Sequence, residues 1–230
     1  MLNLNKDQFE QLQTALGEHI EEESKKSVSK FDETLDTVVK KLIDEGWTLP
    51  AELPIMAVDA LGNTNELNDV NLFMEQFYSH DDYRNMENMI GEIQESKIKD
   101  GLIKLINECW WAFKAQKYAI CSTALVSAIE GILSEFSDDK RDTRMMKVCQ
   151  KQVDTLPADT GTIIKHVWSS YNQFIRKLFH PSDFTKDEPA DINRHWLSHG
   201  RSDFEIEEID CMKLFNAIHS LCMVANKVCE

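Results

Sequence analysis

The segment from Asn193 to Arg201 gathers the side chains of this chain that are best suited to proton transfer and phosphate binding. Histidine gives or takes a proton near neutral pH, and arginine meets a phosphate with a planar fork of donors. Phosphodiester cleavage by a neighbouring 2′-hydroxyl needs a base, stabilisation of the phosphorane charge and a proton for the leaving oxygen. The segment therefore predicts phosphodiester cleavage without a metal, with Arg194, His199 and His195 as the reacting groups.

The spacing of these residues limits how the segment can fold. Asn193 is suited to cap a helix and Gly200 to end one, which predicts a short helical piece between them. On a regular helix His195 and His199, four apart, share a face. Arg194 and His199 are five apart and diverge by about 140° around the axis. We therefore expect either a bent turn at the mouth of a bundle or a site that two copies of the chain complete together.

The chain is acidic overall, whereas the region around this segment is locally cationic. The formal net charge is −15. Between residues 161 and 201, six Lys or Arg side chains stand against four Asp or Glu, with four histidines in addition. The acidic bulk argues against broad, sequence-blind coating of nucleic acids, but it is compatible with a small cationic cleft.

The remaining composition predicts a folded cytoplasmic protein without a membrane segment. The apolar content of 42% is ordinary for a folded chain, and no apolar run reaches the length of a membrane span. The first ten residues are polar and charged, unlike a signal peptide. Six cysteines form no CxxC pair and lie in helix-like apolar patterns, which favours reduced, buried thiols.

Helical periodicity dominates the chain and strand-like alternation is scarce, which predicts an all-α fold. Glycine and proline mark breaks near residues 46–50, 62–65 and 181–189, and the last of these is the longest loop signal. We expect helices near residues 5–24, 28–45, 53–62, 66–78, 81–95, 98–116, 118–137, 141–152, 160–180 and 207–229.

Four long amphipathic helices after residue 97 predict a four-helix bundle over residues 97–230, preceded by a helical N-terminal region over residues 1–96. The last of these helices carries its apolar residues at the spacing of one helix face. That face comprises Cys211, Leu214, Phe215, Ile218, Cys222, Ala225 and Cys229. The tryptophans expected in the core are Trp47, Trp110, Trp111 and Trp168.

The run Asn193-Arg194-His195-Trp196-Leu197-Ser198-His199-Gly200 resembles the motif of the HEPN superfamily. In that motif an arginine followed by a polar residue precedes a histidine, with four to six residues between the arginine and the histidine. The NRHxxxHG wording is similar to the version found in helical proteins of bacterial defence and toxin systems. The upstream helix from Ala124 to Leu133 resembles the ALxxxIEGxL segment that often precedes the motif.

This resemblance implies a metal-independent endoribonuclease that uses no cofactor and is built as an all-α, HEPN-like four-helix bundle. It implies that RNA is cut to 2′,3′-cyclic phosphate and 5′-hydroxyl ends, by a toxin or an effector of phage defence. It implies a homodimer with a composite active site, and an antitoxin or regulatory protein as a partner. By position, Arg194 would hold the scissile phosphate, His199 would be the general acid or base, and His195 would orient the site or share proton transfer.

Three further residues are candidates for substrate binding or support of the site. Asn193 begins the motif, and Arg201 is either a cation on the substrate side or a surface charge. Glu130 is either a solvated glutamate on its helix or a partner that orients Arg194.

Other functions remain open at the level of sequence. The chain could be a catalytically silent HEPN-like module that binds a partner protein or RNA, or an all-α regulatory subunit in which the histidines are structural. A zinc site from His195 and His199 is disfavoured, since no glutamate stands between them as in HExxH and the local sequence fixes no third ligand.

Overall fold

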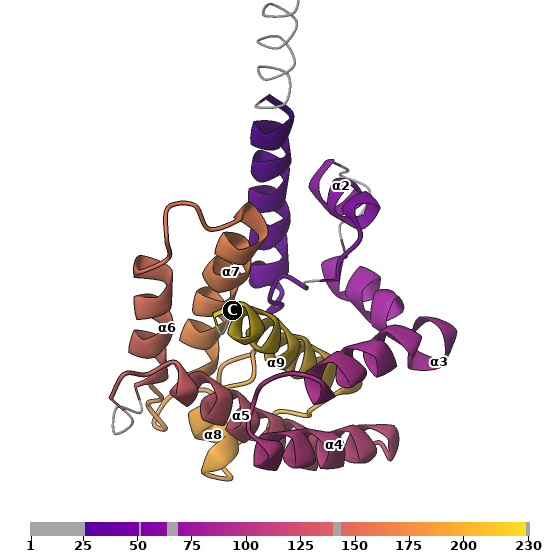
Figure 1. Ribbon diagram of the computed structural model, residues 1–230. Helices are drawn as coiled ribbons and strands as arrows, with labels where there is room; N and C mark the ends of the chain where they lie inside the picture. The colour runs from indigo at the N-terminus through magenta and orange to yellow at the C-terminus, as the bar shows by residue number, and fades with distance from the viewer. Residues whose placement is uncertain (1–25, 51, 64–68, 140–143, 229–230) are drawn as a thin grey trace, which may run out of the picture.

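The computed structural model describes residues 26–50, 52–63, 69–139 and 144–228, and every regular element in these ranges is a helix (Figure 1). The expected all-α fold is confirmed. The helix expected at 5–24 and Cys229 lie outside the described residues. A first helix covers 26–44, and the elements after it are α2 (Ile55–Asn63), α3 (Val70–Gln94), α4 (Asp100–Lys114), α5 (Tyr118–Glu135), α6 (Met145–Asp154), α7 (Thr162–Leu178), α8 (Arg194–Ser198) and α9 (Glu208–Val228).

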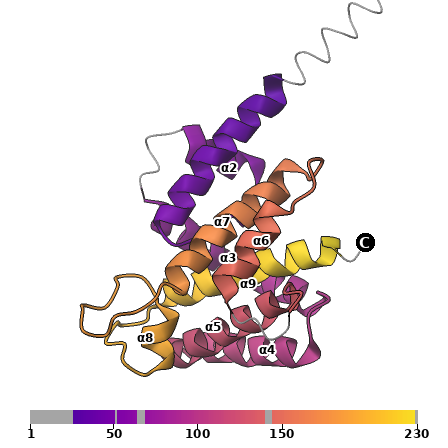
Figure 2. The same ribbon diagram turned by 90° about the vertical axis from the view of Figure 1, so that its left-hand side faces the viewer.

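Helix α9 lies at the centre of the fold. It packs against α5, α3 and α7, while α4 packs on α5 and α6 packs on α7. Figures 1 and 2 show α9 passing between the other long helices. The apolar face expected for this helix is confirmed as core, since five of its members are buried: Cys211, Leu214, Phe215, Ile218 and Cys222.

The core joins the N-terminal part of the described chain to the rest. One cluster of buried apolar side chains runs from Leu35 in the first helix to Val224 in α9. The four helices expected to form the bundle correspond to α4, α5, α7 and α9, and α3 and α6 pack on them. The division of the chain at residue 96 stays a prediction.

Helix α3 contains an interruption where two separate helices were expected. Asp81, Asp82 and Tyr83 have positive φ values of 54°, 56° and 63°, so the backbone leaves the right-handed helix there. The Nδ2 of Asn85 donates to the carbonyl of Phe77 at 2.7 Å, which bridges the interruption. The sequence therefore located the break correctly to within a few residues.

A charged and hydrogen-bonded cluster crosses the centre of the fold. His219 of α9 is 1% exposed. Its Nδ1 lies 3.0 Å from Glu52 Oε2 and its Nε2 lies 2.7 Å from Glu92 Oε2 of α3. The Tyr78 hydroxyl donates to Asn216 Oδ1 at 2.9 Å and lies 3.1 Å from Glu52 Oε1. The segment after the first helix, α3 and α9 are therefore held together by polar contacts as well as apolar packing.

The tryptophan and cysteine expectations have different outcomes. Trp47, Trp110 and Trp168 are buried as expected, but Trp111 is 69% exposed, so its assignment to the core was wrong. Trp111 follows Trp110 on the same helix, and adjacent helical residues point about 100° apart. The five cysteines within the described ranges are buried and unpaired: Cys109, Cys121, Cys149, Cys211 and Cys222. In the same ranges, no helix has the length and apolar character needed to cross a bilayer.

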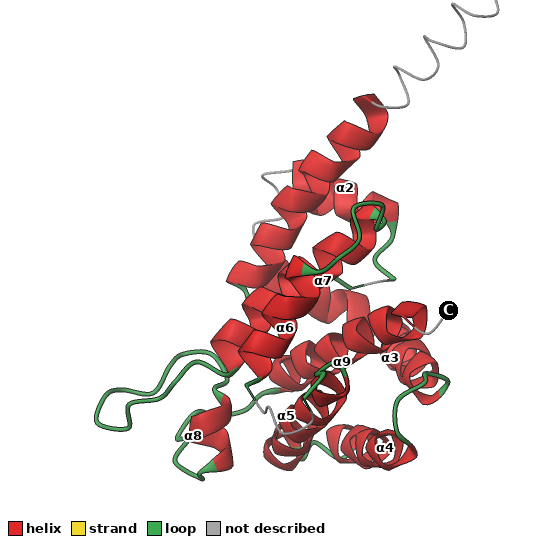
Figure 3. Cartoon of the chain, turned by 60° about the vertical axis from the view of Figure 1, so that its left-hand side comes forward, coloured by secondary structure: helices red, strands yellow, loops and turns green. Residues whose placement is uncertain are grey.

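The short helix α8 stands apart from the main packing layers. A long loop leads from the end of α7 at Leu178 to α8, and a second loop leads from α8 to the start of α9 at Glu208. Figure 3 shows α8 and the preceding loop projecting from one side of the molecule. Helix α8 contacts α5, which places the 193–201 segment beside the helix that carries Glu130.

Candidate functional site

Asn193 begins helix α8 as a side-chain cap. Its backbone is extended, with φ −119° and ψ 126°, and its Oδ1 accepts the backbone N–H of His195 at 2.9 Å and of Trp196 at 3.4 Å. These are amide groups that a helix start leaves without backbone partners. The expected capping by Asn193 is therefore observed.

The same side chain also ties α8 to the loop that precedes it. Asn193 is only 4% exposed. Its Oδ1 accepts from the Ser182 hydroxyl at 2.9 Å, and its Nδ2 donates to the His180 carbonyl at 3.0 Å. Both ends of the carboxamide are thus engaged inside the protein. Asn193 therefore has an architectural position, in which Oδ1 and Nδ2 are both hydrogen-bonded within the protein.

Gly200 ends the helix as the sequence predicts. It has a φ of +60°, a left-handed conformation that glycine adopts without steric cost. The N–H of Gly200 donates to the Leu197 carbonyl at 3.2 Å, and the N–H of Arg201 donates to the Trp196 carbonyl at 3.0 Å. Helix α8 is therefore a short regular piece with defined ends, and the expected bent turn is not what joins Arg194 to His199.

Arg194 points toward α5, where it meets Glu130. The Arg194 Nη2 lies 3.3 Å from Glu130 Oε2, with the two side chains 30% and 29% exposed. This contact corresponds to the reading of Glu130 as a partner of Arg194. A partly exposed ion pair of this kind adds little stability because solvent screens it. Its effect is to fix the direction of the guanidinium.

These residues line a pocket of about 470 Å³ between α5, α6 and α8. Its charged and titratable groups are Glu130, Arg144, Arg194 and His195. Met145, Met146 and Phe179 supply apolar walls, and Pro181 and Ser182 complete the rim. Two arginines and one imidazole facing one opening make a site that suits a phosphate group.

His195 favours its neutral form more than an ordinary histidine does. Partial burial lowers the pKa of His195, and the charges of Arg194 and His199 lower it further, while Glu130 opposes the shift. The neutral imidazole is the form that can act as a base. Its ring is nearly parallel to that of His199, with 6.4 Å between ring centres and 11° between ring planes. The expectation that His195 and His199 share a helix face is therefore met.

His199 and Arg201 lie around Phe184 at the C-terminal end of α8, beyond the pocket wall. His199 is exposed and is not part of the pocket wall that holds Arg194. Its ring meets Phe184 edge to face at 5.8 Å, and the Phe184 ring also packs against Trp196 at 5.1 Å. The Arg201 guanidinium lies 4.4 Å from the centre of the Phe184 ring. Within one chain, then, the structure brings Arg194 together with His195 and Glu130, and leaves His199 outside.

Two residues near the site were not predicted from the sequence. Arg144 lies far from the motif in sequence, directly before α6, and only the packing of α6 on α5 brings it to the pocket. Phe184 belongs to the long loop before α8, where apolar periodicity gives no guide. The nearest available signal was the position of that loop immediately before the motif.

A carboxylate closes the base of the loop that carries α8. Glu188 Oε2 accepts the backbone N–H of Asp203 at 2.8 Å, and Glu188 Oε1 accepts the Ser202 hydroxyl. Residues on either side of α8 are thereby joined. The short helix is held at its base as well as by its caps.

Over the described ranges, no group of three or more His, Cys, Asp or Glu side chains is placed to hold a metal ion. Comparison with known proteins found no family model that matches the chain, and no curated protein or solved structure that is significantly similar to it.

Proposed function

We propose that the pocket between α5, α6 and α8 is the catalytic site of a metal-independent endoribonuclease. The observation that carries the proposal is that Arg194, Arg144 and His195 line one opening. The centre of the His199 ring lies 6.4 Å from that of the His195 ring. Arginine provides the charge for the phosphate and the two imidazoles provide the proton transfers. The lowered pKa of His195, which arises from burial and from nearby Arg194, favours the neutral form needed in a base.

In this reaction the 2′-hydroxyl oxygen of the RNA attacks the adjacent phosphorus. His195 takes the proton from that hydroxyl, and Arg194, held by Glu130, stabilises the charge on the phosphorane oxygens. The bond from phosphorus to the 5′ oxygen then breaks, and protonated His199 gives its proton to that oxygen. The products are a 2′,3′-cyclic phosphate and a 5′-hydroxyl end.

The resemblance of the 193–200 segment to the HEPN motif supports the same chemistry and suggests a setting for it. We propose a toxin or phage-defence effector with an HEPN-like bundle, regulated by an antitoxin or another protein. Arg144 and Arg194 at the pocket would draw an RNA phosphate to this opening of an otherwise acidic chain.

The position of His199 supports a composite site in a homodimer. His199 is exposed and lies outside the pocket that holds Arg194. A second copy of the chain, docked at α8, could therefore present its own His199 to the phosphate held by Arg194. In such a dimer His195 would be the base and the partner's imidazole the acid.

The decisive assay is RNA cleavage in the presence of EDTA. We expect the wild type to cut RNA and to leave cyclic phosphate ends, and we expect Arg194→Ala and His199→Ala to lose the activity by about a hundredfold or more. His180→Ala is the matched control, because this exposed histidine precedes the same loop without lining the pocket. Equal cleavage by all variants, or cleavage abolished by EDTA, would refute the assignment.

Mixing the two inactive variants tests the composite site separately. If two chains share the site, a mixture of Arg194→Ala and His199→Ala regains activity, because one of the two sites of a mixed dimer contains both intact side chains. If each chain is complete alone, the mixture stays inactive. The second result would refute the shared site, but it would not refute the endoribonuclease activity.

A catalytically silent module that binds a partner protein is the second candidate. It is favoured by exposed apolar side chains on the α4–α5 hairpin, where Trp111 is 69% and Ile120 is 68% exposed. Contiguous exposed apolar patches often mark interaction surfaces, and these two side chains flank the connection between α4 and α5. Absence of cleavage across structured and unstructured RNAs, together with no growth inhibition on expression, would favour this candidate over the enzyme.

A further inference from the structure

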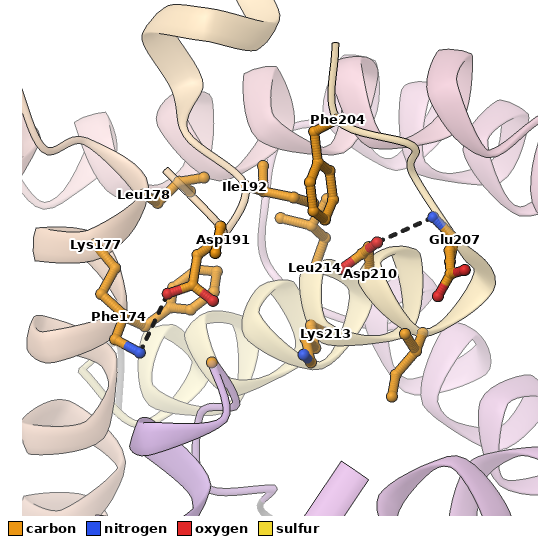
Figure 4. A pocket seen from close by; sticks show the side chains of 13 residues that line it. Phe174, Lys177, Leu178, Asp191, Ile192, Phe204, Glu207, Asp210, Lys213 and Leu214 are labelled. Carbon is orange, nitrogen blue, oxygen red and sulfur yellow. Dashed lines mark hydrogen bonds and ion pairs between the residues drawn. The ribbon is translucent and has the colours of Figure 1, made fainter. Parts of the chain in front are cut away.

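A second cavity lies where α7 and α9 meet the segments that lead into and out of α8 (Figure 4). Its volume is about 230 Å³. Pockets for drug-sized ligands measure roughly 300–1,000 Å³, so this cavity is suited to a smaller molecule. The residues around it take no part in the proposed RNA cleavage.

One part of the cavity wall is apolar and comes from several elements. The residues concerned are Phe174 and Leu178 of α7, Leu214 of α9, and Ile192 and Phe204 from the segments around α8. An aliphatic or aromatic group of a ligand would be removed from water against these side chains.

One lysine at the cavity already has an ion-pair partner and a hydrogen-bond acceptor, whereas a second lysine has neither within the described residues. Lys177 Nζ lies 3.4 Å from Asp191 Oδ2 and donates to the Asp44 carbonyl at 3.2 Å. Lys213 Nζ lies 5.8 Å from the centre of the Trp47 ring. Within the described part of the chain, no acceptor lies at hydrogen-bond or ion-pair distance from Lys213 Nζ. The Lys213 ammonium is therefore available to an anionic group.

A buried carboxylate faces the same space. Asp210 is 8% exposed, and its Oδ2 accepts the backbone N–H of Glu207 at 2.9 Å. Figure 4 shows Asp210 and Asp191 on opposite sides of the cavity, with Lys213 between them. Burial raises the pKa of Asp210 and lowers the pKa of Lys213, and the charge of each group opposes the shift of the other.

One position in the cavity wall has no side chain that would fill the space beside these charges. Gly46 lies there, and a Cβ at this position would stand 3.9 Å from Lys213 Nζ and 4.0 Å from Asp191 Oδ1. The absence of a side chain at Gly46 leaves the space beside the Lys213 ammonium open to a ligand.

We propose that this cavity binds a small zwitterion with an apolar body, of the class of the apolar α-amino acids. The ligand carboxylate would pair with Lys213 and its ammonium with Asp210. The cavity is lined by Asp191, Glu207 and Asp210 against only Lys177 and Lys213, so a simple anion is repelled. A simple cation would leave Lys213 without a partner. Only a ligand with both charges satisfies both sides.

Ligand binding in the cavity is expected to affect the position of α8. Asp191 and Ile192 of the wall directly precede the Asn193 cap, and Phe204 follows the loop end that Glu188 closes. A ligand held by these segments would fix the base of the α8 loop and change the surroundings of His195 and His199. The site is thus a candidate for control of α8 by a small molecule.

The test uses the full chain with L-leucine, L-valine and L-phenylalanine in calorimetric titrations. The matched probes are 4-methylpentanoate and 3-methylbutylamine, which keep the apolar body of leucine and carry one charge each. We expect saturable binding of at least one amino acid and no binding of the single-charge probes. Failure of all three amino acids to bind, or equal binding of a single-charge probe, overturns the proposal.

Substitutions at the cavity test whether the ligand binds there. Lys213→Met and Asp210→Asn should each weaken the binding by about tenfold or more, because each removes a charged partner while keeping most of the side-chain volume. Lys104→Met, on the exposed face of α4, should leave it unchanged. Unchanged affinity in both cavity variants overturns the location.

Ligand-induced shifts in the imidazole NMR signals of His195 and His199 are expected, and binding without them overturns the link to α8. Neither readout depends on RNA cleavage, so this proposal and the endoribonuclease can fail separately.

Discussion

At the scale of single residues, the 193–201 segment divides its work between architecture and chemistry. Asn193 is enclosed and fully engaged in capping and loop contacts. Arg194 and His195 face the pocket, whereas His199 and Arg201 gather around Phe184. Residues that adjoin in sequence therefore serve different purposes, which leads to two predictions.

Asn193→Asp should destabilise the protein although aspartate is an equally good helix cap. The substitution keeps the acceptor for the α8 amides but replaces the donor to the His180 carbonyl with a buried negative oxygen. We expect a loss of about 1–3 kcal/mol in the free energy of unfolding, measured by urea denaturation. The control is Asp69→Asn at the exposed cap of α3, which should change stability by only a few tenths of a kcal/mol. Equal effects of the two substitutions would show that the His180 contact contributes nothing.

His195 should titrate below the ordinary pKa of histidine, and its pKa should depend on its neighbours. Burial is the main cause of the lowered pKa, and the Arg194 charge adds to it, so Arg194→Met should raise the pKa. Glu130→Gln should lower it, because Glu130 favours the charged imidazole. The measurement is an NMR titration of ¹³C-labelled histidine, with the His195 signal assigned from His195→Gln. Shifts in the opposite directions would contradict the arrangement of charges described for the pocket.

At the scale of elements, close helix contacts depend on small side chains at defined places. Gly62 of α2 lies against the first helix, and an added Cβ would stand 2.4 Å from Thr34 Cγ2. The Thr34 side chain cannot turn away freely, because its hydroxyl donates to the Lys30 carbonyl at 2.9 Å. The approach of α2 to the first helix therefore requires the absence of a side chain at position 62.

Gly62→Ala should accordingly lower the free energy of unfolding by about 1–3 kcal/mol, despite the better helix propensity of alanine. Removing the methyl group with Thr34→Ser should recover most of this loss in the double variant. Urea denaturation of both single variants and the double variant gives the coupling between the two positions. Additive effects would mean that the two side chains do not meet as described.

The elements were more predictable from the sequence than the site. Long periodic stretches such as α7 and α9 bury one face continuously, so their existence could be predicted from spacing alone. The caps at Asn193 and Gly200 were predictable because local backbone chemistry determines them. The presence of Arg144 in the same pocket wall as Arg194 was not predictable, since it depends on how α6 packs on its neighbours. Trp111 was misassigned for a related reason: side-chain type does not specify which way a helix is turned.

At the scale of the whole molecule, the His219 cluster links stability to pH. Burial alone would lower the pKa of His219, but hydrogen bonds and charges from Glu52 and Glu92 outweigh it and raise the pKa. A histidine with a raised folded-state pKa stabilises the fold fully below its unfolded pKa of about 6.5. That stabilisation is lost as the pH rises through the folded-state pKa. Glu52 has a lowered pKa, since its contacts with His219 outweigh burial, so its contribution is lost only at acid pH.

We therefore expect the free energy of unfolding to fall as the pH rises from about 6.5 into the alkaline range. Glu92→Gln should make this fall shallower, because one of the two carboxylates that raise the His219 pKa is gone. Urea denaturation at a series of pH values measures both slopes. Glu87→Gln, at a more remote carboxylate of the same helix, should retain the slope of the wild type. A wild-type slope that is flat or rises with pH would contradict the charged state assigned to His219.

The reactivity of the buried cysteines can report the local opening of the helices that carry them. Their thiols are spread over α4, α5, α6 and α9, and none within the described ranges is paired. Burial raises the pKa of Cys149 to about 12 and that of Cys222 to about 11, so neither forms the reactive thiolate while its helix stays packed. A thiol reagent followed by peptide mass spectrometry would consequently time the opening of individual helices without any engineered label, and would show which part of the fold loosens first.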